Sequence, residues 1–476
     1  MLKQEKERLH KFTSEIQAFL PFAANRDQLN AISTLAGFLF SGNDRAVFLL
    51  KGYAGTGKTN LVSAITRALP SVRWRSVLLA PTGRAAKVFS YFAQRPAFTI
   101  HKKIFHTVSD AGGSLRFTLA ENLHRNTLFI VDESSMIGSG SDAEGSFGNL
   151  LENLFEYVYS GFNCKLVLVG DTAQLPPVGS NLSPALDPDF LRNAFYLNIT
   201  EIELREVARQ RSESGILYNA TKLRQALENG ETSIPRLECA PDLISLSGAD
   251  LEEAIHTNIS EFGEENVIII TRSNKRAGMY NQSFRNQIRL YEEDLCAGDR
   301  IMIVKNNYYW LPENNGEAGF IANGDMAEIT RITRREELYG FAFCDCSVRL
   351  LDYPALPELQ VKLITSCLHS DNPALTREEQ KTLYQNVLED MQDEPSRVLR
   401  NAYVRKSPYY NALQVKFSYA ITCHKSQGGQ WPVVFIDQGY TGPEGPGADH
   451  LRWLYTAITR ASERVYLLNF KEEMLL

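Results

Sequence analysis

The stretch AVFLLKGYAGTGKTN, residues 46–60, constrains the fold more than any other part of the chain. Residues 52–59 fit the pattern G-x-x-x-x-G-K-[ST] in full, after an apolar run and before the amphipathic stretch NLVSAITRAL. A strand, a glycine-rich loop and a helix in this order bind phosphate, because glycines let backbone N–H groups approach phosphate oxygens and the helix N-terminus attracts anions. The sequence therefore predicts an α/β domain with a nucleotide site.

Within this loop, Lys58 is expected to reach the β- and γ-phosphates, and Thr59 to ligate Mg²⁺. The expected nucleotide-binding residues of the loop are Gly52, Ala54, Gly55, Thr56, Gly57, Lys58, Thr59 and Asn60.

Three further polar residues are candidates for the same site. Asp132 and Glu133 follow the apolar run LFIV, where one carboxylate can hold Mg²⁺ and the other can polarise an attacking water. Gln174, in LVGDTAQLPPVG, could sense the γ-phosphate or hold the water, and a plain polar turn is the alternative.

Short apolar runs alternate with amphipathic stretches along the chain. The runs are AVFLLK, SVLLAPT, TLFIVDE and KLVLVGD before residue 172, and NVIIITR and VVFIDQG after residue 265. Runs without polar alternation, separated by helices, are typical of parallel sheets that are covered on both faces. With 476 residues, two to four domains are expected, so we predict two α/β cores.

Two segments interrupt this pattern. Residues 306–410 contain short strand-like pieces and turn signals such as NNG, followed by the helix-like TREEQKTLYQNVLEDMQ, which indicates a small β-barrel with a helical excursion. Residues 105–127 predict a β-hairpin, turned at SDAGGS.

Composition excludes several classes of protein. The net charge of −6 means that any contact with a polyanion must use local basic patches, such as residues 272–289 or 396–406, although a solvated helix face is the simpler reading of each. Seven scattered cysteines without CxxC pairs argue against a disulfide framework and a zinc site, and favour a cytoplasmic setting. No apolar run approaches the length of a membrane span, so no membrane partner is expected.

Ten motifs in a fixed order carry a family resemblance. They are NRDQLNAI, GYAGTGKTN, LLAPTGRAAK, TIHKKIF, IVDESSM, VGDTAQLPPVG, LREVARQ, IIITRSN, SYAITCHKSQGGQW and LYTAITRASERVYLL. This order resembles superfamily 1 helicases of the 5′-to-3′ branch, of the RecD-like and Dda-like kind. TCHKSQG followed by YTAITRA is the most specific pair.

The resemblance implies an α/β fold with two RecA-like cores and ATP between them, plus a β-hairpin insertion and an SH3-like β-barrel insertion. The first core would cover residues 1–200, with the hairpin at 105–127. The second core would cover 201–305 and 411–476, interrupted by the barrel at 306–410.

The resemblance also implies roles for individual residues. Gln28 would read adenine, and Gln174 would couple the γ-phosphate state to the grip on DNA. Arg209 and Arg460 would be arginine fingers from the second core, and Lys58 and Glu133 complete the expected catalytic set. Ser426, Gln427 and Gly428 would line the boundary with ATP.

The residues expected near single-stranded DNA are Pro81, Thr82, His101, Arg272, Asn274, Thr422, His424 and Lys425. The aromatic residues Phe105, Phe117, Tyr308 and Trp310 could stack on bases or act as a wedge, with packing inside small domains as the alternative. Contacts to phosphate carry no sequence information, so binding should be non-specific and salt-sensitive.

These expectations combine into an ATP- and Mg²⁺-dependent helicase that moves 5′ to 3′ on single-stranded DNA and unwinds forked DNA. Two alternatives stay open: a RecD-like motor subunit of a recombination or exonuclease complex, and a P-loop regulatory NTPase that binds a protein partner. Candidate partners are recombination, repair or replication proteins.

Overall fold

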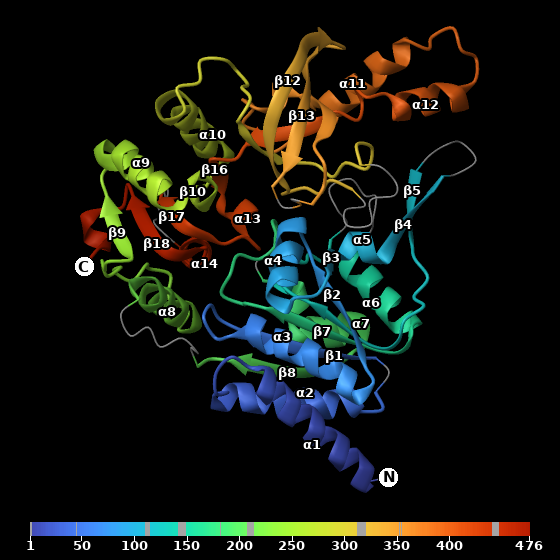
Figure 1. Ribbon diagram of the computed structural model, residues 1–476, viewed down its shortest axis with the longest axis vertical. Helices are drawn as coiled ribbons and strands as arrows, with labels where there is room; N and C mark the ends of the chain where they lie inside the picture. Colours follow the sequence, from blue (N-terminus) through green and yellow to red (C-terminus); the bar gives the residue numbers. More distant parts are fainter. Residues whose placement is uncertain are drawn as a thin grey trace.

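A computed structural model of the chain describes residues 2–43, 45–109, 115–140, 149–180, 182–206, 214–311, 320–351, 353, 355–439 and 447–476. The side chains of residues 2–5, 107–109 and 115–117 are outside this description. Figure 1 shows two α/β lobes, the first in blue to green and the second in yellow-green and red, with a barrel in orange above them.

The first lobe is built on a six-stranded parallel sheet of order β3-β2-β6-β7-β1-β8. Its strands are β1 (Ala46–Gly52), β2 (Arg75–Ala80), β3 (Ala97–Thr99), β6 (Arg125–Val131), β7 (Phe162–Gly170) and β8 (Asn198–Leu204). Its helices are α1 (Leu2–Phe19), α2 (Arg26–Phe40), α3 (Lys58–Ala68), α4 (Gly83–Ala93), α5 (Ile100–Ile104), α6 (Leu150–Ser160) and α7 (Pro188–Phe195). All residues of β1 are buried, because apolar clusters cover both sheet faces, one including Phe12 and Phe48 and the other Leu49 and Phe155.

The second lobe has a five-stranded parallel sheet of order β16-β10-β17-β18-β9. Its strands are β9 (Leu243–Leu246), β10 (Val267–Thr271), β16 (Ala420–Thr422), β17 (Trp431–Asp437) and β18 (Ala461–Leu468). Its helices are α8 (Gly215–Glu228), α9 (Leu251–Phe262), α10 (Asn274–Ser283), α13 (Cys423–Ser426) and α14 (Ala448–Ile458). Helices α8 and α14 share one apolar cluster with the sheet, through residues such as Leu223 and Leu454.

A closed barrel of β11 to β15 is inserted into the second lobe. The barrel strands are β11 (Arg300–Ile303), β12 (Met326–Leu338), β13 (Phe341–Leu350), β14 (Leu359–Ile364) and β15 (Leu413–Phe417). Between β14 and β15 the chain forms α11 (Arg377–Glu389) and α12 (Arg397–Lys406), which project from the barrel in Figure 1. In the first lobe, β4 (Phe105–Ser109) and β5 (Leu115–Leu119) form an antiparallel two-stranded sheet.

The predicted fold class is confirmed. All six apolar runs form strands of the two parallel sheets, and the barrel and the hairpin are present. The barrel strands extend from Arg300 to Phe417, beyond the range 306–410 at both ends, and the boundary at residue 200 falls inside β8. That strand pairs with β1 along its whole length, so the first sheet ends later than expected.

The barrel also touches the first lobe, at the start of α4. A Cβ atom on Gly83 would overlap Asp325 Oδ1, the Arg84 guanidinium donates to Met326 Sδ at 2.9 Å, and Lys87 Nζ donates to the Leu351 carbonyl at 2.9 Å. These contacts connect the first lobe to an insertion of the second.

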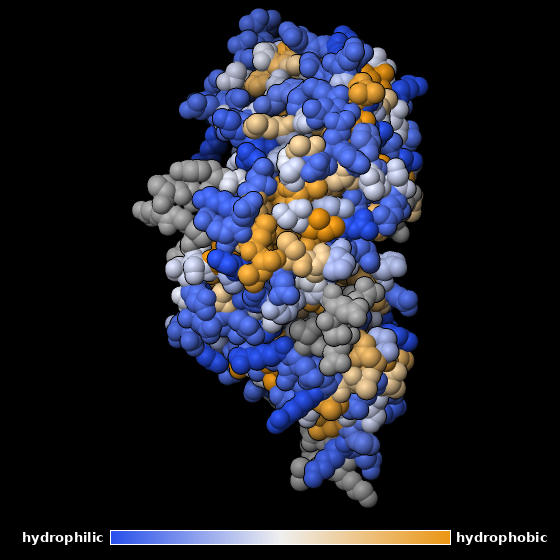
Figure 2. All heavy atoms as spheres, turned by 90° about the vertical axis from the view of Figure 1, so that its left-hand side faces the viewer, coloured by the Kyte–Doolittle hydropathy of each residue, from blue (hydrophilic) through white to orange (hydrophobic). Residues whose placement is uncertain are grey.

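Figure 2 shows the face that carries α8, α9 and β9. Hydrophobic residues gather over its middle, and hydrophilic residues cover most of the surface above and below. Within the described ranges, no helix has the length and apolar character that crossing a bilayer requires.

Candidate functional site: a nucleotide cavity and a cleft between the lobes

The glycine-rich loop begins where β1 ends, and its conformation depends on its glycines. Gly55 and Gly57 have φ values of 80° and 82°, a region that side chains with a Cβ disfavour. A Cβ atom on Gly52 would lie 2.9 Å from Thr56 Oγ1, so this position also needs glycine. Helix α3 starts at Lys58, directly after the loop, and its N-terminal amides face the cavity that the loop borders.

The Lys58 ammonium lies within the loop. Its Nζ donates to the carbonyl oxygens of Gly52, at 2.6 Å, and Tyr53, at 3.0 Å. Because these are neutral acceptors, a phosphate oxygen at the same place would form a stronger, charge-assisted bond with the ammonium.

Gln28 lies beneath the loop and is fully buried. Its Oε1 accepts from the Asn25 N–H in a capping box at the start of α2, and its Nε2 donates to the Thr56 carbonyl at 3.0 Å. Gln28 therefore braces the loop from below, and it is not among the residues that line the cavity.

A cavity of about 230 Å³ lies between the loop and the second lobe. Its walls bring together most of the predicted nucleotide and catalytic residues. Those that line it are Ala54, Gly55, Gly57, Lys58, Thr59, Asn60, Asp132, Glu133, Gln174, Gly428 and Arg460.

Asp132 and Glu133 come directly after β6, at the carboxyl edge of the sheet. Burial, followed by the neighbouring Glu133 carboxylate, raises the pKa of Asp132 to about 7. Glu133 has a φ of 50°, which is uncommon for a residue with a side chain and is typical of strained functional positions. The Asp132 carboxyl gains stability as an anion when a cation lies beside it.

Arg460 reaches the cavity from the second lobe, at the end of α14. Its guanidinium lies 3.9 Å from the Glu133 carboxylate, and it donates to the Thr456 and Gly429 carbonyls at 3.1 and 3.3 Å. The second lobe therefore contributes a fixed cation to a cavity whose floor belongs to the first lobe.

The donor set of the cavity fits a nucleoside triphosphate with a divalent cation. Lys58, Arg460 and the loop amides offer positive charge to phosphates, while Asp132 and Thr59 offer oxygens to a hard cation such as Mg²⁺. Among the described side chains, Gln174 Oε1 is a buried acceptor with no hydrogen-bond partner, and it faces this cavity.

Helix α14 contacts the first lobe directly beside the cavity. The Tyr455 hydroxyl accepts from the Ala54 N–H at 2.9 Å and donates to Asp171 Oδ2 at 2.6 Å. Burial, reinforced by the Asp171 carboxylate, raises the pKa of Tyr455 well above its usual range, so the hydroxyl stays a donor. Tyr455 thereby joins the glycine-rich loop, the strand end after β7 and the second lobe.

The residue after Gln174 is held from the same side. The Leu175 N–H donates to Thr456 Oγ1 at 2.9 Å, and its carbonyl accepts from Gln427 Nε2 at 2.7 Å. Both backbone groups of Leu175 are thus bonded to the second lobe, and any movement between the lobes acts on Gln174.

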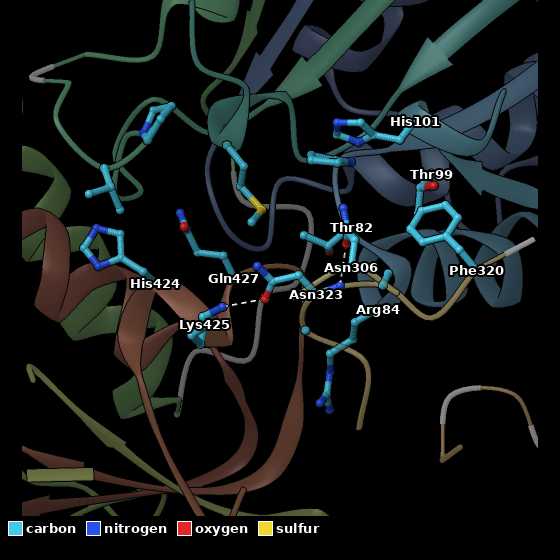
Figure 3. A pocket seen from close by; sticks show the side chains of 16 residues that line it. Thr82, Arg84, Thr99, His101, Asn306, Phe320, Asn323, His424, Lys425 and Gln427 are labelled. Carbon is cyan, nitrogen blue, oxygen red and sulfur yellow. Dashed lines mark hydrogen bonds between the residues drawn. The ribbon is translucent and has the colours of Figure 1, made fainter. Parts of the chain in front are cut away.

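A second hollow, which we call the interlobe cleft, has a volume of about 360 Å³. Figure 3 shows His424, Lys425 and Gln427 entering it from one side and Thr82 and His101 from the other. Asn306, Phe320 and Asn323, from the segments that flank the barrel strands, complete its wall, and Lys425 Nζ donates to Asn323 Oδ1 at 2.6 Å. Among the described residues that line the cleft, none is acidic.

Burial lowers the pKa of two side chains in this cleft. It lowers the pKa of Lys425 to about 8, and it lowers the pKa of His424 below its ordinary value. At neutral pH, Lys425 therefore stays largely charged and His424 is neutral.

The structure brings five of the eight predicted DNA-binding residues together in the interlobe cleft: Pro81, Thr82, His101, His424 and Lys425. The other three lie elsewhere: Thr422 precedes α13, Asn274 begins α10, and the Arg272 guanidinium bonds His450 Nδ1 at 2.8 Å.

Five other predicted residues remain. Gln427 lines the interlobe cleft instead of the nucleotide cavity, and Gly52 and Thr56 support the loop from behind. Arg209 and the side chain of Phe117 lie outside the described residues.

Sequence reasoning missed several residues of these sites. Phe22 and Phe92 line the nucleotide cavity and offer aromatic surface to a base, and Phe320 and Asn323 line the interlobe cleft. Tyr455 lies within the quoted motif LYTAITR, but a tyrosine on an apolar helix resembles a core residue until its partners are known.

Comparison with known proteins agrees with this geometry. A family model described as an AAA domain matches residues 23–238, and one described as a UvrD-like helicase C-terminal domain matches residues 417–468. Together these matches contain the glycine-rich loop, the carboxylates after β6 and Arg460.

Two curated relatives are DNA helicases. The ATP-dependent RecD2 DNA helicase of Deinococcus radiodurans is 26% identical over 322 residues, which cover 64% of this chain and 39% of RecD2. The ATP-dependent DNA helicase dda of Enterobacteria phage T4 is 26% identical over 267 residues, which cover 53% of this chain and 55% of dda. The aligned part thus spans about half or less of each relative's length.

Among solved structures, that of two coordinating Pif1 helicases at forked double-stranded DNA aligns with 96% of this chain and 94% of its own, at 15% identity and a TM-score of 0.48. By the two family matches, the two curated relatives and the order of its motifs, the chain is similar to superfamily 1 helicases of the branch of RecD2 and dda, which are ATP-dependent DNA helicases.

Proposed function

We propose that this chain is an ATP- and Mg²⁺-dependent motor that moves 5′ to 3′ along single-stranded DNA and separates the strands of a fork. The observation that carries the proposal is the shared nucleotide cavity. The glycine-rich loop and Glu133 belong to the first lobe, and Arg460 of the second lobe lies 3.9 Å from the Glu133 carboxylate.

The residues of this cavity can divide the work of phosphoryl transfer. Lys58 and the loop amides would bind the phosphates, and Glu133 would orient and polarise the attacking water. Arg460 would stabilise negative charge that develops on the transferred phosphoryl group, as an arginine finger does. Mg²⁺, held by Thr59 and Asp132, would supply further positive charge at the phosphate oxygens.

Hydrolysis would be coupled to movement through the contacts of Leu175. Gln427 lines the interlobe cleft and bonds the Leu175 carbonyl, while the neighbouring Gln174 faces the nucleotide cavity. A change in the position of Gln174 is therefore transmitted to the cleft through one peptide unit and one side chain.

The interlobe cleft would bind the single strand. The described part of its lining has no carboxylate and includes Lys425 and Arg84 as cations, which suits a phosphodiester backbone. We propose the residues up to the end of β8 at Leu204 as the first moving lobe, and residues 214–299 with 418–476 as the second. The direction of movement rests on the likeness to the family's 5′-to-3′ branch, and the names of RecD2 and dda support DNA as the substrate.

Strand displacement with tailed duplexes tests this function. The purified chain should show ATPase activity that single-stranded DNA stimulates, and it should unwind a duplex with a 5′ tail but not one with only a 3′ tail. A Lys58→Ala variant should lose both activities. Unwinding restricted to 3′-tailed substrates would reverse the proposed direction, and absence of DNA-stimulated ATPase in the isolated chain would favour a motor subunit that needs partner proteins.

A further inference from the structure

A third hollow lies between the barrel and its helical excursion, and we call it the barrel–helix cavity. It has a volume of about 260 Å³ and lies between the segment after β11 and helices α11 and α12. Two cations, Lys305 and Arg405, and three tyrosines, Tyr308, Tyr309 and Tyr410, are part of its lining. The rest of the described lining is amide or apolar, and none of it is acidic.

This composition differs from that of the molecule as a whole, which has a net charge of −6. Helix α12 forms one side of the cavity and carries four basic and no acidic residues over Arg397–Lys406. Residues 396–406 form a basic patch in the sequence, and the proposed motor activity assigns it no role. A pocket that combines cations with aromatic rings is suited to a nucleotide, because the cations bind phosphate and the rings stack on a base.

The barrel–helix cavity adjoins the interlobe cleft. Asn306 lines both hollows, and the ring of Tyr308 lies 4.8 Å from that of Phe320, which lines the cleft. A polymer that occupies the cleft can therefore continue past this aromatic pair into the cavity. A separate small ligand would not need the two hollows to be adjacent.

Hydrogen bonds between wall residues hold the shape of the cavity before any ligand binds. Asn307 Oδ1 accepts from the Tyr309 N–H at 3.0 Å, and Asn307 Nδ2 donates to the Asn411 carbonyl at 2.8 Å. Lys305 Nζ donates to Gln380 Oε1 on α11 at 2.9 Å, so the ammonium is held at the wall. The residues Tyr309 and Tyr410 are 40% and 38% exposed, which leaves aromatic surface for a base to stack on.

We propose that the barrel–helix cavity is a second subsite for single-stranded DNA, in which a base stacks on Tyr410 and Lys305 and Arg405 bind its phosphate. The volume lies just below the roughly 300–1,000 Å³ of small-molecule pockets, which suits one nucleotide. This inference rests on the proposed DNA-binding function, and it extends the path of the strand beyond the interlobe cleft.

Fluorescence anisotropy with oligothymidylates of two lengths tests the proposal. An oligomer of about 6 nucleotides is expected to need the interlobe cleft alone, whereas one of about 16 can also reach the barrel–helix cavity. Tyr410→Ala should weaken binding of the longer oligomer by about 10- to 100-fold, the range expected for loss of one stacked base. Arg405→Gln should also weaken it and should lower the salt slope by about one, because it removes one phosphate contact. Binding of the shorter oligomer should stay within about twofold, and Tyr410→Phe should restore the longer one because it keeps the ring.

Two control variants change residues of α12, the helix of Arg405, that do not line the cavity. Tyr403→Ala removes a ring of similar exposure whose hydroxyl bonds Asp390, and Arg397→Gln removes a cation at the other end of α12. Both should bind the two oligomers like the wild type.

Each outcome has one meaning. If Tyr410→Ala and Arg405→Gln bind both oligomers like the wild type, the second subsite is refuted while the DNA-binding function stands. If the wild type binds neither oligomer, the proposed function itself fails. If the cavity variants lose binding of thymidine monophosphate but not of the longer oligomer, the cavity binds free nucleotide and the strand assignment is overturned.

Discussion

Replacing Tyr455 with phenylalanine should uncouple the nucleotide cavity from the second lobe. The hydroxyl is the only part of the side chain that this change removes, and it makes two bonds, one from the Ala54 N–H and one to the Asp171 carboxylate. Tyr455 is 1% exposed, so water cannot easily replace the lost partner.

The magnitude follows from these two bonds. A buried polar group that loses its partner costs about 1–3 kcal/mol, and the bond to Asp171 is charge-assisted, which places it toward the upper end. The sum is about 2–5 kcal/mol of interaction between the lobes. Because about 1.4 kcal/mol corresponds to a tenfold change, the closed arrangement around the cavity should become about 30-fold less favoured or more.

Steady-state ATPase measurements with and without single-stranded DNA provide the assay. With saturating DNA, kcat of Tyr455→Phe should fall by at least about tenfold, because closure of the lobes brings Arg460 to the phosphates. Tyr466→Phe is the matched control, since its hydroxyl accepts from Asn258 Nδ2 at 3.0 Å within the second lobe. It should lower Tm without lowering kcat. Wild-type kcat and KM in Tyr455→Phe would refute the argument that this hydroxyl couples the lobes.

Three other changes have defined outcomes. Arg460→Ala should lower kcat for ATP by roughly 10³-fold or more, with KM changed only a few-fold, because the guanidinium acts on the transition state. A coupled ATPase assay measures both constants. A higher KM with an unchanged kcat would contradict the finger role. Affinity for single-stranded DNA should fall as pH rises from 7 to 9, because the Lys425 ammonium, with a pKa of about 8, loses its proton. The slope of log affinity against log salt concentration should drop by about one over the same range. The affinity of Lys425→Arg should not change with pH in this range. Burial, followed by the Arg272 charge, lowers the pKa of His450 to about 4, so the unfolded state takes up the proton first and stability is lost as pH falls from about 6.5 to about 4. The loss approaches about 3 kcal/mol, so in urea denaturation the wild type should lose more stability between pH 7 and pH 4.5 than His450→Gln does.

The parallel sheets could be predicted because their central strands are continuous apolar runs. AVFLLK and NVIIITR are buried on both faces in the structure, as such runs require. The short edge strands β3 and β16 have three residues each, too few to show a pattern. The first barrel strand, RIMI, has one basic residue and three apolar ones, so its sequence does not separate it from the preceding lobe.

The nucleotide cavity was more predictable than the cleft. Its residues lie in short motifs whose spacing follows from phosphate binding, as for Lys58, or from a strand end, as for Asp132. The partners of Tyr455 are 284 and 401 residues away in the chain, and no local pattern predicts such pairing. Phe320 and Asn323 were missed for the same reason, since only the closed barrel brings their segment to the cleft.

The contacts between α4 and the barrel have a consequence for movement of the lobes. The first lobe, the second lobe and the barrel all border the interlobe cleft, and the bonds of Arg84 and Lys87 join the barrel to the first lobe. Because the barrel is inserted into the second lobe, it connects the two lobes at a second place, besides the contacts of Tyr455. Rotation of one lobe against the other must therefore carry the barrel along with α4 or break these bonds, and weakening them should let the lobes move further apart.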